Sequence, residues 1–443
     1  MRCALGSSKP ACDGEPVYLH VKNGYFSNIT SSLQSLPSQI QLIDESDKSA
    51  VPGLIDMHVH LTRDEPGAEI NLAPVYLAHG VTSVRDVGSS LRDVKRMRSR
   101  IENGEIPGPR IFFCGPQLNG KVFRPGMCAL QTADETRKQV RTLCAEGVHA
   151  LKIYDQLRPE LAHIVIEEAC KAEIPVCGHL GQTSAQEAIN SGISGIEHLS
   201  SLAFDLFPGL QRNPFSRDMF KNIAETNLSS SVAHKLCDSV VRQKVFIDPT
   251  MVVYERIVRF PELKSGGHCS PFIPQILSDY WLERMDKFAG EWTENDFEVG
   301  KRSFDKLKLW LGSIQREGAL VCAGTDTPNP YLVPGKSLLD EIQLLAEAGL
   351  SNADAIGAAT SVAAEALRKS VEIGAIESGK RADFVLLQGN PLDDISSIEK
   401  IVAVFKDGVR YEPTALKRVA ATMSAAEPTW VSPRRGDMFI DRE

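Results

Sequence analysis

Two histidines separated by one residue, His58 and His60, are the first side chains along the chain with the potential for chemistry. They lie at the end of the apolar run GLIDMHV, and side chains at positions i and i+2 of a strand point to the same face. Neutral imidazole is a common ligand of zinc and related divalent ions. Because Pro52 and Gly53 mark the start of the run, the pair falls at the C-terminal end of a predicted strand, where barrel enzymes place their active sites. This spacing indicates a metal site.

A lysine inside the apolar run HALKIYD, Lys152, is the second unusual side chain. A lone buried lysine is costly unless it is paired or neutralised. One interpretation is a salt-bridged lysine whose aliphatic stem is buried while its amine reaches a partner. The other is a deprotonated amine that has combined with carbon dioxide. The resulting carbamate is a bidentate anion that can bridge two cations, and this run alone leaves both interpretations open.

Three further candidates follow predicted strands. His179 comes after IPVCG, His198 comes after SGIE, and Asp326 ends ALVCAGTD. Taken singly, each has an ordinary structural explanation, because histidines are commonly hydrogen-bonded structural groups and an aspartate before Pro328 is typical of a cap or turn. Their shared position at strand ends favours a joint role. The remaining histidines are predicted to be structural: His20, His79, His149, His163, His234 and His268.

The elements that must position these residues are short apolar runs that alternate with amphipathic stretches between about residues 52 and 365. Eight runs are present, the number that an eightfold β/α barrel requires. They are GLIDMHV, VTSVRDV, RIFFCG, HALKIYD, IPVCGH, SGIEH, KVFIDPTMVV and ALVCAGTD. The span exceeds the roughly 250 residues of a plain barrel. We expect the additional residues between 198 and 245 and between 261 and 320.

The two ends of the chain differ from the middle. Residues 16–50 and 371–411 are both rich in short strand-like runs and turn signals. The sequence therefore predicts an α/β fold, in which a (β/α)8 TIM-like barrel over residues 52–365 carries a small β-sandwich domain. That domain would combine residues 1–51 with residues 366–443. Residues 412–443 hold three prolines and little periodicity, and we expect them to form a surface tail.

The composition narrows the class of protein further. The 443 residues carry 49 Lys and Arg against 57 Asp and Glu, a net charge of −8, which argues against nucleic-acid or anionic-membrane partners. No apolar run approaches the roughly 20 residues that cross a bilayer, and the N-terminal segment lacks the apolar run of a signal peptide. The ten cysteines form no Cys-x-x-Cys pair, as expected for free thiols in a reducing compartment. We expect a cytoplasmic protein, and a homo-oligomer on general grounds.

Taken together, VPGLIDMHVHL, HGVTSVRDVG, ALKIYD, CGHLG, GIEHLS and AGTDT resemble the amidohydrolase superfamily. The similarity is to its imidazolonepropionase-like and Xaa-Pro-dipeptidase-like branch of metal-dependent hydrolases. The C-terminal GAIESGKRADFVLLQGNPLDDI is also similar to the closing β segment of that branch. The resemblance extends from about residue 15 to residue 411, and the ordered combination of four histidines, one lysine and one aspartate is highly specific.

The resemblance implies two divalent metal ions, usually Zn²⁺, at the mouth of the barrel. The implied metal ligands are His58, His60, Lys152, His179, His198 and Asp326. Lys152 would be carboxylated and, with a hydroxide, would bridge the two ions. The hydroxide would attack a substrate carbonyl, while Asp326 would accept its proton as a general base and deliver it to the leaving nitrogen as a general acid.

Substrate specificity is less well defined than the metal ligands. The lysine separates the chain from imidazolonepropionase relatives, and KIYDQLRPE and LNGKVFRPGMC depart from the dipeptidase pattern. Tyr254 matches a strand-seven position where relatives contact the substrate or oxyanion, and Arg124 is predicted to receive a substrate carboxylate. The leading hypothesis is hydrolysis of an amide or other C–N bond in a small molecule, such as an N-acyl amino acid, a dipeptide-like compound or a cyclic amide. A lactone or ester hydrolase or decarboxylase with the same metals, and a non-catalytic metal-binding scaffold, are the alternatives.

Overall fold

The eight apolar runs contain the strands of a parallel β barrel in the computed structural model, which describes residues 2–3, 17–35, 41–62, 68–207, 215–266 and 273–423. The strands are β5 Leu54–Val59, β6 Val81–Asp86, β7 Arg110–Phe113 with its continuation β8 Gln117–Asn119, β10 Leu151–Ile153, β11 Val176–Gly178, β12 Gly195–Glu197, β13 Phe246–Asp248 and β14 Leu320–Val321. β9, Met127–Ala129, lies beside β8. Every run contributes one barrel strand, so the prediction of an eightfold barrel is confirmed.

The barrel closes through parallel pairing and a few linking hydrogen bonds. β5, β6 and β7 form one sheet, and β14, β13, β12, β11, β10 and β8 follow one another in a second. The amide of His149 donates to the carbonyl of Phe113 at 2.9 Å and joins the two sheets. On the other side, the amide of Met57 donates to the carbonyl of Ala323 at 3.0 Å, and Val59 pairs with Thr327. All strand C-termini therefore meet at one end of the barrel.

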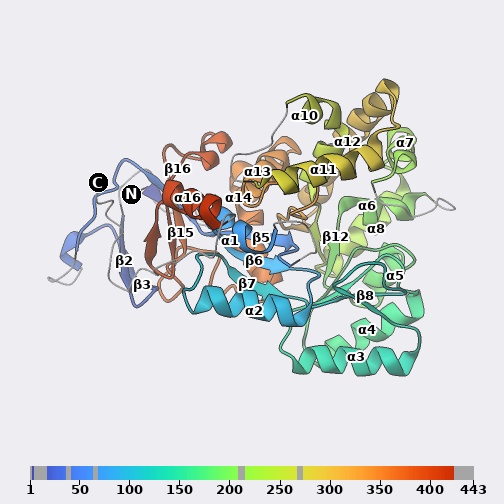
Figure 1. Cartoon of the computed structure of the whole chain (residues 1–443), viewed down its shortest axis with the longest axis horizontal. Helices are drawn as coiled ribbons and strands as arrows, with labels where there is room; N and C mark the ends of the chain where they lie inside the picture. The colour runs from blue at the N-terminus through green and yellow to red at the C-terminus, as the bar shows by residue number, and fades with distance from the viewer. Residues whose placement is uncertain are drawn as a thin grey trace.

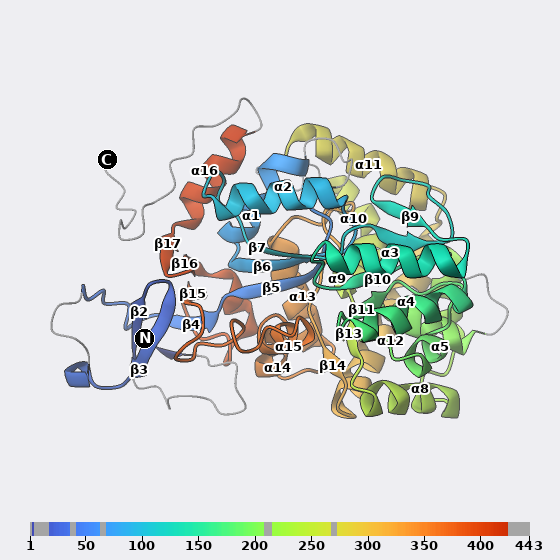
Figure 2. The same ribbon diagram turned by 90° about the horizontal axis from the view of Figure 1, so that it is seen from below.

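Helices cover the outside of this barrel, and α2 to α5 and α8 lie along its outer surface (Figure 2). The helices in or around the barrel are α1 Ala68–Ala78, α2 Leu91–Glu102, α3 Ala133–Ala145, α4 Pro159–Lys171, α5 Ala185–Asn190, α6 Leu199–Ala203, α7 Arg217–Glu225, α8 Ser231–Arg242, α9 Met251–Val258, α10 Phe260–Gly266, α11 Gln275–Ala289, α12 Glu294–Arg316, α13 Lys336–Glu347, α14 Asn352–Ala358 and α15 Ser361–Ala366. The additional helices α6 and α7, and α10 to α12, fall where the extra length was expected. They form the upper right of Figure 1.

A small β domain is built from both ends of the chain, to the left in Figure 1. Its five-stranded sheet has the order β1 Arg2–Cys3, β4 Ser49–Pro52, β15 Phe384–Leu387, β16 Ile401–Lys406 and β17 Val409–Tyr411. A hairpin of β2 Tyr18–Lys22 and β3 Tyr25–Thr30 packs on this sheet, with the rings of Phe26 and Phe384 5.7 Å apart. The predicted β-sandwich domain is thus confirmed, while its division from the barrel at residues 52 and 365 stays a prediction.

Two local expectations were wrong. The run KVFIDPTMVV is a strand only as far as Asp248, because the chain turns at Thr250 and continues as α9. The expected tail begins instead with helix α16, Pro413–Met423, which lies against α1 in both views and buries Leu416 and Ala420 (Figures 1 and 2). Residues 424–443 of the expected tail lie outside the described residues.

Two general expectations can be compared with the described part of the chain. No helix in the described ranges is long and apolar enough to cross a membrane. Seven of the cysteines are free thiols: Cys114, Cys128, Cys144, Cys170, Cys177, Cys237 and Cys322. Cys177 and Cys322 are buried in one apolar cluster inside the barrel, and burial raises the pKa of both thiols. They fill space, as the sequence indicated.

Candidate metal centre

The histidine pair of β5 lies at the C-terminal end of the barrel and faces Asp326. The Nε2 atom of His60 lies 3.0 Å from Asp326 Oδ1, and Nε2 of His58 lies 3.5 Å from the same oxygen. Both rings are buried, with their centres 5.5 Å apart. The i, i+2 spacing therefore places two imidazoles and one carboxylate from β5 and the segment after β14 at one point.

The histidines that follow β11 and β12 reach the same point from the other side of the barrel. The ring of His198 lies 4.9 Å from that of His58 and 4.5 Å from that of His179. His198 Nε2 is 3.9 Å from Asp326 Oδ2. His58, His198 and Asp326 each offer an atom within 4.8 Å of the other two, as a shared cation would require. His179 Nε2 is buried and has no hydrogen-bond partner among the described residues. This donor set fits a divalent metal ion.

Lys152 lies on β10, at the floor of the same cluster. Its side chain is 1% exposed, and its nearest carboxylate oxygen, Glu197 Oε2, is 3.8 Å away. Within the described part of the chain, its amine makes no hydrogen bond. A fully buried amine without a hydrogen bond is costly, because an ammonium needs donors satisfied or its charge removed. The geometry therefore does not support the simple interpretation of a closely salt-bridged lysine.

The charges around the centre keep two of the imidazoles in the form that binds metal. Burial lowers the pKa of His179 to about 3, and the Lys152 amine lowers it further. Burial also holds the pKa of His198 well below its usual range, with His179 contributing in the same direction. His58 behaves differently: burial and Lys152 oppose its protonation, yet the carboxylates of Asp326 and Glu197 raise its pKa to about 9. These carboxylates stabilise a positive charge on the His58 ring. A metal cation bound at Nε2 of His58 would take the place of the proton that carries this charge.

A buried layer beneath the ligands was missed by sequence reasoning. Glu197 Oε2 lies 2.7 Å from His58 Nδ1, and Arg85 Nη2 donates to Glu197 Oε1 at 2.7 Å. Asp248 Oδ2 is 3.4 Å from the same His58 nitrogen and 3.5 Å from Arg85. The two carboxylates orient His58, so that its Nε2 is the nitrogen facing Asp326. Arg85 supplies one positive charge for these two carboxylates, and His58, Glu197 and Asp248 also offer three atoms within 4.8 Å of one another.

One feature of the sequence indicates this buried layer. Arg85, Glu197 and Asp248 are charged residues inside the apolar runs VTSVRDV, SGIEH and KVFIDPTMVV, just as Lys152 is inside HALKIYD. A charged residue within an apolar barrel strand must point into the polar interior or be paired. The pairing itself could not be inferred, because Arg85 and Glu197 are 112 residues apart on β6 and β12.

The backbone is strained at three residues that follow β12, β13 and β14. His198, Thr250 and Asp326 have φ values of 62°, 48° and 60°, in the left-handed region that non-glycine residues rarely adopt. Each such residue costs on the order of 1–3 kcal/mol and persists where the surroundings hold it. Thr250 also orients a ligand, since its hydroxyl lies 2.7 Å from Nδ1 of His198. The strain therefore coincides with the side chains that converge on the centre.

A cavity of about 210 Å³ opens directly above the centre. Its walls include the four converging histidines, Asp326 and the predicted substrate residue Arg124. The remaining lining residues are Gln117, Tyr154, Phe215, Val253, Arg256, Ile257, Arg284, Met285, Phe288, Asn329, Pro330 and Leu332. Arg124 Nη2 donates to Gln117 Oε1 at 2.8 Å, which holds the guanidinium at the cavity wall. This position agrees with a role in substrate binding.

Tyr254, the other predicted substrate residue, is placed differently. It lies on α9 rather than on strand seven, is fully buried, and its hydroxyl accepts a hydrogen bond from the amide of Ser200 at 2.8 Å. Its ring lies 5.1 Å from that of Phe215, which itself lines the cavity. Its contact with substrate stays a prediction, and the geometry gives it a packing role behind Phe215.

The histidines predicted to be structural have partners elsewhere. His79 Nδ1 lies 2.9 Å from the carbonyl of Val75, and His149 Nδ1 accepts from the amide of Phe113 at 3.2 Å. The remaining contacts are His20 with Ser27 at 2.8 Å, His163 with Ser191 at 3.2 Å and His234 with Glu317 at 3.8 Å. His268 lies outside the described residues.

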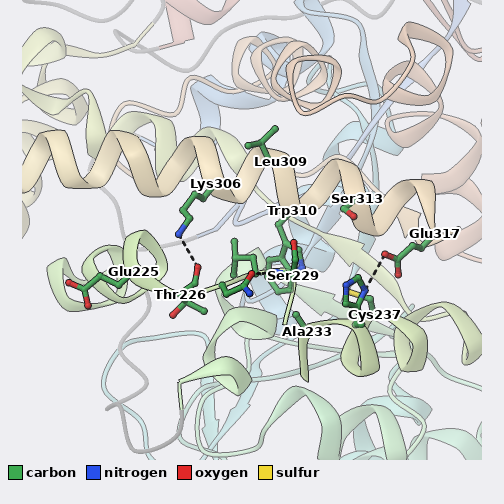
Figure 3. Close-up of a pocket in the computed structure, with 13 residues that line it drawn as sticks. Glu225, Thr226, Ser229, Ala233, Cys237, Lys306, Leu309, Trp310, Ser313 and Glu317 are labelled. Atoms are coloured by element: carbon green, nitrogen blue, oxygen red, sulfur yellow. Dashed lines mark hydrogen bonds and ion pairs between the residues drawn. The ribbon is translucent and has the colours of Figure 1, made fainter. Parts of the chain in front are cut away.

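A second cavity, of about 420 Å³, lies between α7, α8 and α12 (Figure 3). Its basic side chains are engaged with neighbouring groups. The amine of Lys306 donates to the carbonyl of Thr226 at 2.8 Å and to those of Ile223 and Ala224, which end α7. His234 pairs with Glu317 across the cavity. These contacts tie three helices together and supply no ligand cluster comparable to that at the barrel end.

The comparison with known families agrees with this site. The description "Amidohydrolase family" matches residues 49–209 and 310–410, so the chain belongs to that family of metal-dependent enzymes. Ochratoxinase from Aspergillus niger is 21% identical over 415 residues, covering 80% of this chain and 73% of that protein. The chain is therefore a hydrolase that acts on carbon–nitrogen bonds.

Solved structures show the same fold. A putative prolidase from Bifidobacterium longum aligns with a TM-score of 0.68 and 23% identity, over 96% of this chain and 97% of that one. Bottromycin amidohydrolase aligns with a TM-score of 0.72 and 20% identity, over 94% of this chain and 89% of that one. At these identities the likeness establishes the architecture, a barrel with a small additional domain, and leaves the substrate to be argued from the site.

Proposed function

We propose that this chain hydrolyses an amide bond of a small molecule with two divalent metal ions, Zn²⁺ by preference. The observation that carries the proposal is the convergence of four imidazoles and Asp326, together with the buried amine of Lys152, which makes no hydrogen bond to any residue that the structure describes. The names of the similar proteins support the reaction class, since a prolidase and an amidohydrolase cleave amide bonds.

The ligands divide by the side of the barrel from which they come. His58 and His60, with Asp326, would hold one ion, and His179 and His198 would hold the other. Carboxylation of Lys152 would convert an uncompensated buried amine into a bridging anion, which accounts for the absence of a close carboxylate partner. When bound, the two ions polarise a carbonyl group and lower the pKa of water to near neutrality.

The protein's own groups would supply the proton transfers and the orientation. Asp326 follows β14 and lines the cavity, where its carboxylate would take a proton from the attacking water and return it to the leaving nitrogen. That second transfer is essential, because an amide anion is a poor leaving group. Arg124, fixed by Gln117, would hold a substrate carboxylate.

Metal analysis of the purified protein tests the proposal most directly. We expect close to two divalent ions per chain, and hydrolysis of members of an amide and dipeptide panel that stops on removal of metal by a chelator and returns when Zn²⁺ is added. Fewer than one ion per chain with chelator-insensitive turnover would overturn it. Release of acid from lactones, or of carbon dioxide, without amine release would favour the alternative chemistries. Two bound ions with no turnover on any panel would favour a scaffold.

The cytoplasmic location and homo-oligomeric state stay predictions.

A further inference from the structure

Asp56 is a buried carboxylate on β5 that the proposed chemistry does not use. It is 0% exposed and lies two residues before His58. Among the described residues, it belongs neither to the lining of the cavity nor to the candidate clusters of metal ligands. Because burying a polar group is costly unless hydrogen bonds replace the lost water, the partners of Asp56 indicate its role.

The partners of Asp56 lie on the segment that carries Asp326. Oδ1 of Asp56 accepts hydrogen bonds from the amide of Thr325 and from that of His58, both at 3.1 Å. Oδ2 accepts a third hydrogen bond from the Thr325 hydroxyl at 2.8 Å. One carboxylate thus joins the strand that bears the histidine pair to the residue immediately before Asp326.

Thr325 extends this contact to the residue on the other side of Asp326. Its hydroxyl lies 3.0 Å from that of Thr327 and accepts a hydrogen bond from the Thr327 amide at 3.2 Å. The Thr327 hydroxyl in turn lies 2.5 Å from the Tyr76 hydroxyl on α1. All members of this Asp56 network are buried: Asp56, Thr325, Thr327 and Tyr76. Asp326 is therefore flanked by two residues that one buried hydrogen-bond network fixes.

Asp326 lies beyond the regular part of the barrel sheet. β14 pairs with β13 through Leu320 and Val321, and Asp326 follows the end of this pairing. Its φ of 60° belongs to the left-handed region, which a residue with a Cβ adopts only where the surrounding structure holds it. The position of Asp326 therefore depends on contacts other than the pairing of β14 with β13.

Backbone hydrogen bonds to β5 supply part of this support. The amide of Asp326 donates to the carbonyl of His58 at 2.7 Å, and the amide of His60 donates to the carbonyl of Thr327 at 2.8 Å. The backbone of β5 and the side chain of Asp56 thus act on the same short segment. Together they place the Asp326 carboxylate 3.0 Å from Nε2 of His60.

We propose, building on the function above, that Asp56 is a positioning residue for Asp326 and that Thr325 transmits its effect. The Asp56 network would hold the Asp326 carboxylate where it can bind an ion with the histidine pair and can return a proton to the leaving nitrogen. Asp56 itself would touch neither the substrate nor an ion. Because such groups must be held within about 0.5 Å of the productive geometry, loss of the network should reduce turnover as well as stability.

Thr325→Val is the deciding variant, because Asp56→Ala would leave two buried amides without an acceptor and destabilise the barrel. The valine lacks the hydroxyl that joins Asp56 to Thr327. For an amide substrate of the panel, we expect kcat to fall about 10–100-fold while KM stays within about threefold of the wild-type value. Calorimetric titration of the metal-free protein with Zn²⁺ should show one of the two binding steps weakened about 10–100-fold and the other unchanged.

Two further substitutions grade the effect along the network. Thr325→Ser keeps the hydroxyl, so kcat and both Zn²⁺ affinities should stay within about threefold of the wild-type values. Tyr76→Phe removes only the outermost hydroxyl and should change kcat in the same direction as Thr325→Val, by a smaller factor.

The matched control is Thr136→Val on α3. Thr136 is also 0% exposed, and its hydroxyl donates to the carbonyl of Thr132 at 2.8 Å. This variant loses a buried hydroxyl outside the Asp56 network. It should lower the urea midpoint of unfolding, as Thr325→Val should, and leave kcat and the Zn²⁺ affinities unchanged.

The outcomes separate this inference from the proposed function. If Thr325→Val lowered only the urea midpoint, or if Thr325→Ser lost as much kcat and Zn²⁺ affinity as Thr325→Val, the positioning role would be refuted. A wild-type protein that binds two ions but hydrolyses no amide would refute the function, while the Zn²⁺ affinities would still decide on Asp56. A wild-type protein that binds no Zn²⁺ would refute both.

Discussion

Two clusters of charges, one buried and one half-buried, lie at opposite ends of the barrel, and they differ in how fully their charges are paired. The first cluster, at the strand C-termini, is the metal centre with its buried layer. The second, the interdomain cluster, joins the strand N-termini to the small β domain and consists of Arg110, Arg381, Asp383 and Asp407. Both clusters are built from residues that are distant in sequence. Comparing them therefore separates the charge pairing that stabilises the fold from the unpaired donor atoms that a ligand site needs.

In the interdomain cluster, each charge meets a partner at hydrogen-bond distance. Arg110 donates to Asp383 and to Asp407, both at 2.6 Å, and Arg381 donates to Asp407 at 2.7 Å. In the candidate metal centre, no carboxylate of the described residues lies closer than 3.8 Å to the amine of Lys152. A cluster whose task is to join two domains can satisfy itself, whereas a cluster that holds a ligand keeps donor atoms unpaired until the ligand arrives.

The largest expected effect comes from a substitution that disrupts the candidate metal centre and leaves the fold intact. Lys152→Met should lower metal content and reduce kcat/KM by more than the roughly 10–100-fold that follows loss of an outer partner of a metal ligand. The metal-free variant should nevertheless be as stable as the metal-free wild type, or more stable by about 1–3 kcal/mol, because a buried charge is removed. Metal analysis, kinetics and urea unfolding measure the three quantities.

The smaller variant Lys152→Ala gives an independent check on the carbamate. It leaves space beside the ligands, so millimolar short carboxylates should partly restore metal content and activity. The Met variant has no such space and should not respond. If Lys152→Met kept its metal and its activity, the unpaired amine of Lys152 would have no role in binding metal, and the proposed difference between the two clusters would be contradicted.

The next largest effect comes from a substitution that disrupts the interdomain cluster and leaves metal binding and catalysis unchanged. Arg110→Met should lower the free energy of unfolding by about 3–5 kcal/mol, because Asp383 becomes a buried carboxylate without its cation. The kcat of the folded fraction and its metal content should be unchanged. Urea unfolding at neutral pH and active-site titration would measure both.

The control for Arg110 is a pair on the surface. Lys95 and Glu146 also lie 2.6 Å apart but are exposed, so Lys95→Met should cost about 0–1 kcal/mol. Equal losses for the two variants, or a loss of metal in Arg110→Met, would show that the interdomain cluster is not the separate structural unit inferred here.

The two clusters also mark how far sequence reasoning reached. The predicted metal ligands lie at or near strand ends, so their apolar runs made them candidates, as for His58 and His179, and the combined set came from the resemblance to a family. The interdomain cluster could not, because Arg110 and Asp383 are 273 residues apart and each looks like an ordinary charged residue near a strand. Local pattern predicts where a side chain points, and only tertiary packing decides which distant charge it meets.

Helix α16 and Tyr254 illustrate the same limit. Leu416 and Ala420 lie four residues apart on one apolar face, but a helix of 11 residues gives too short a pattern to recognise beside the prolines of the chain end. Packing against α1 stabilises this helix instead. For Tyr254, the run PTMVV continues the strand composition, and the left-handed backbone of Thr250 that starts α9 cannot be inferred from a β-branched residue.

The smallest expected effect concerns a half-buried histidine outside both clusters, His149, which lies two residues before β10. Burial lowers its pKa to about 4, and the positive charges of Arg98 and Lys369 lower it further. In the unfolded chain a histidine titrates near 6.5. Between pH 6.5 and pH 4 the unfolded chain therefore binds a proton that the folded protein does not, so stability falls as pH decreases through this window and is fully present above it.

His149→Asn should flatten this dependence, since its amide oxygen can still accept the hydrogen bond from Phe113 and has no charge to gain. We expect the loss of unfolding free energy between pH 7.5 and pH 5 to be smaller than in the wild type by about 1 kcal/mol, after allowance for partial exposure. Urea unfolding of the metal-free protein at the two pH values measures it, with His163→Asn on the exposed face of α4 as the control that keeps the wild-type slope. If the dependence of the unfolding free energy on pH were unchanged in His149→Asn, we would assign the acid sensitivity to the candidate metal centre, where four further imidazoles gather. That cluster would then be the one that loses more stability at low pH.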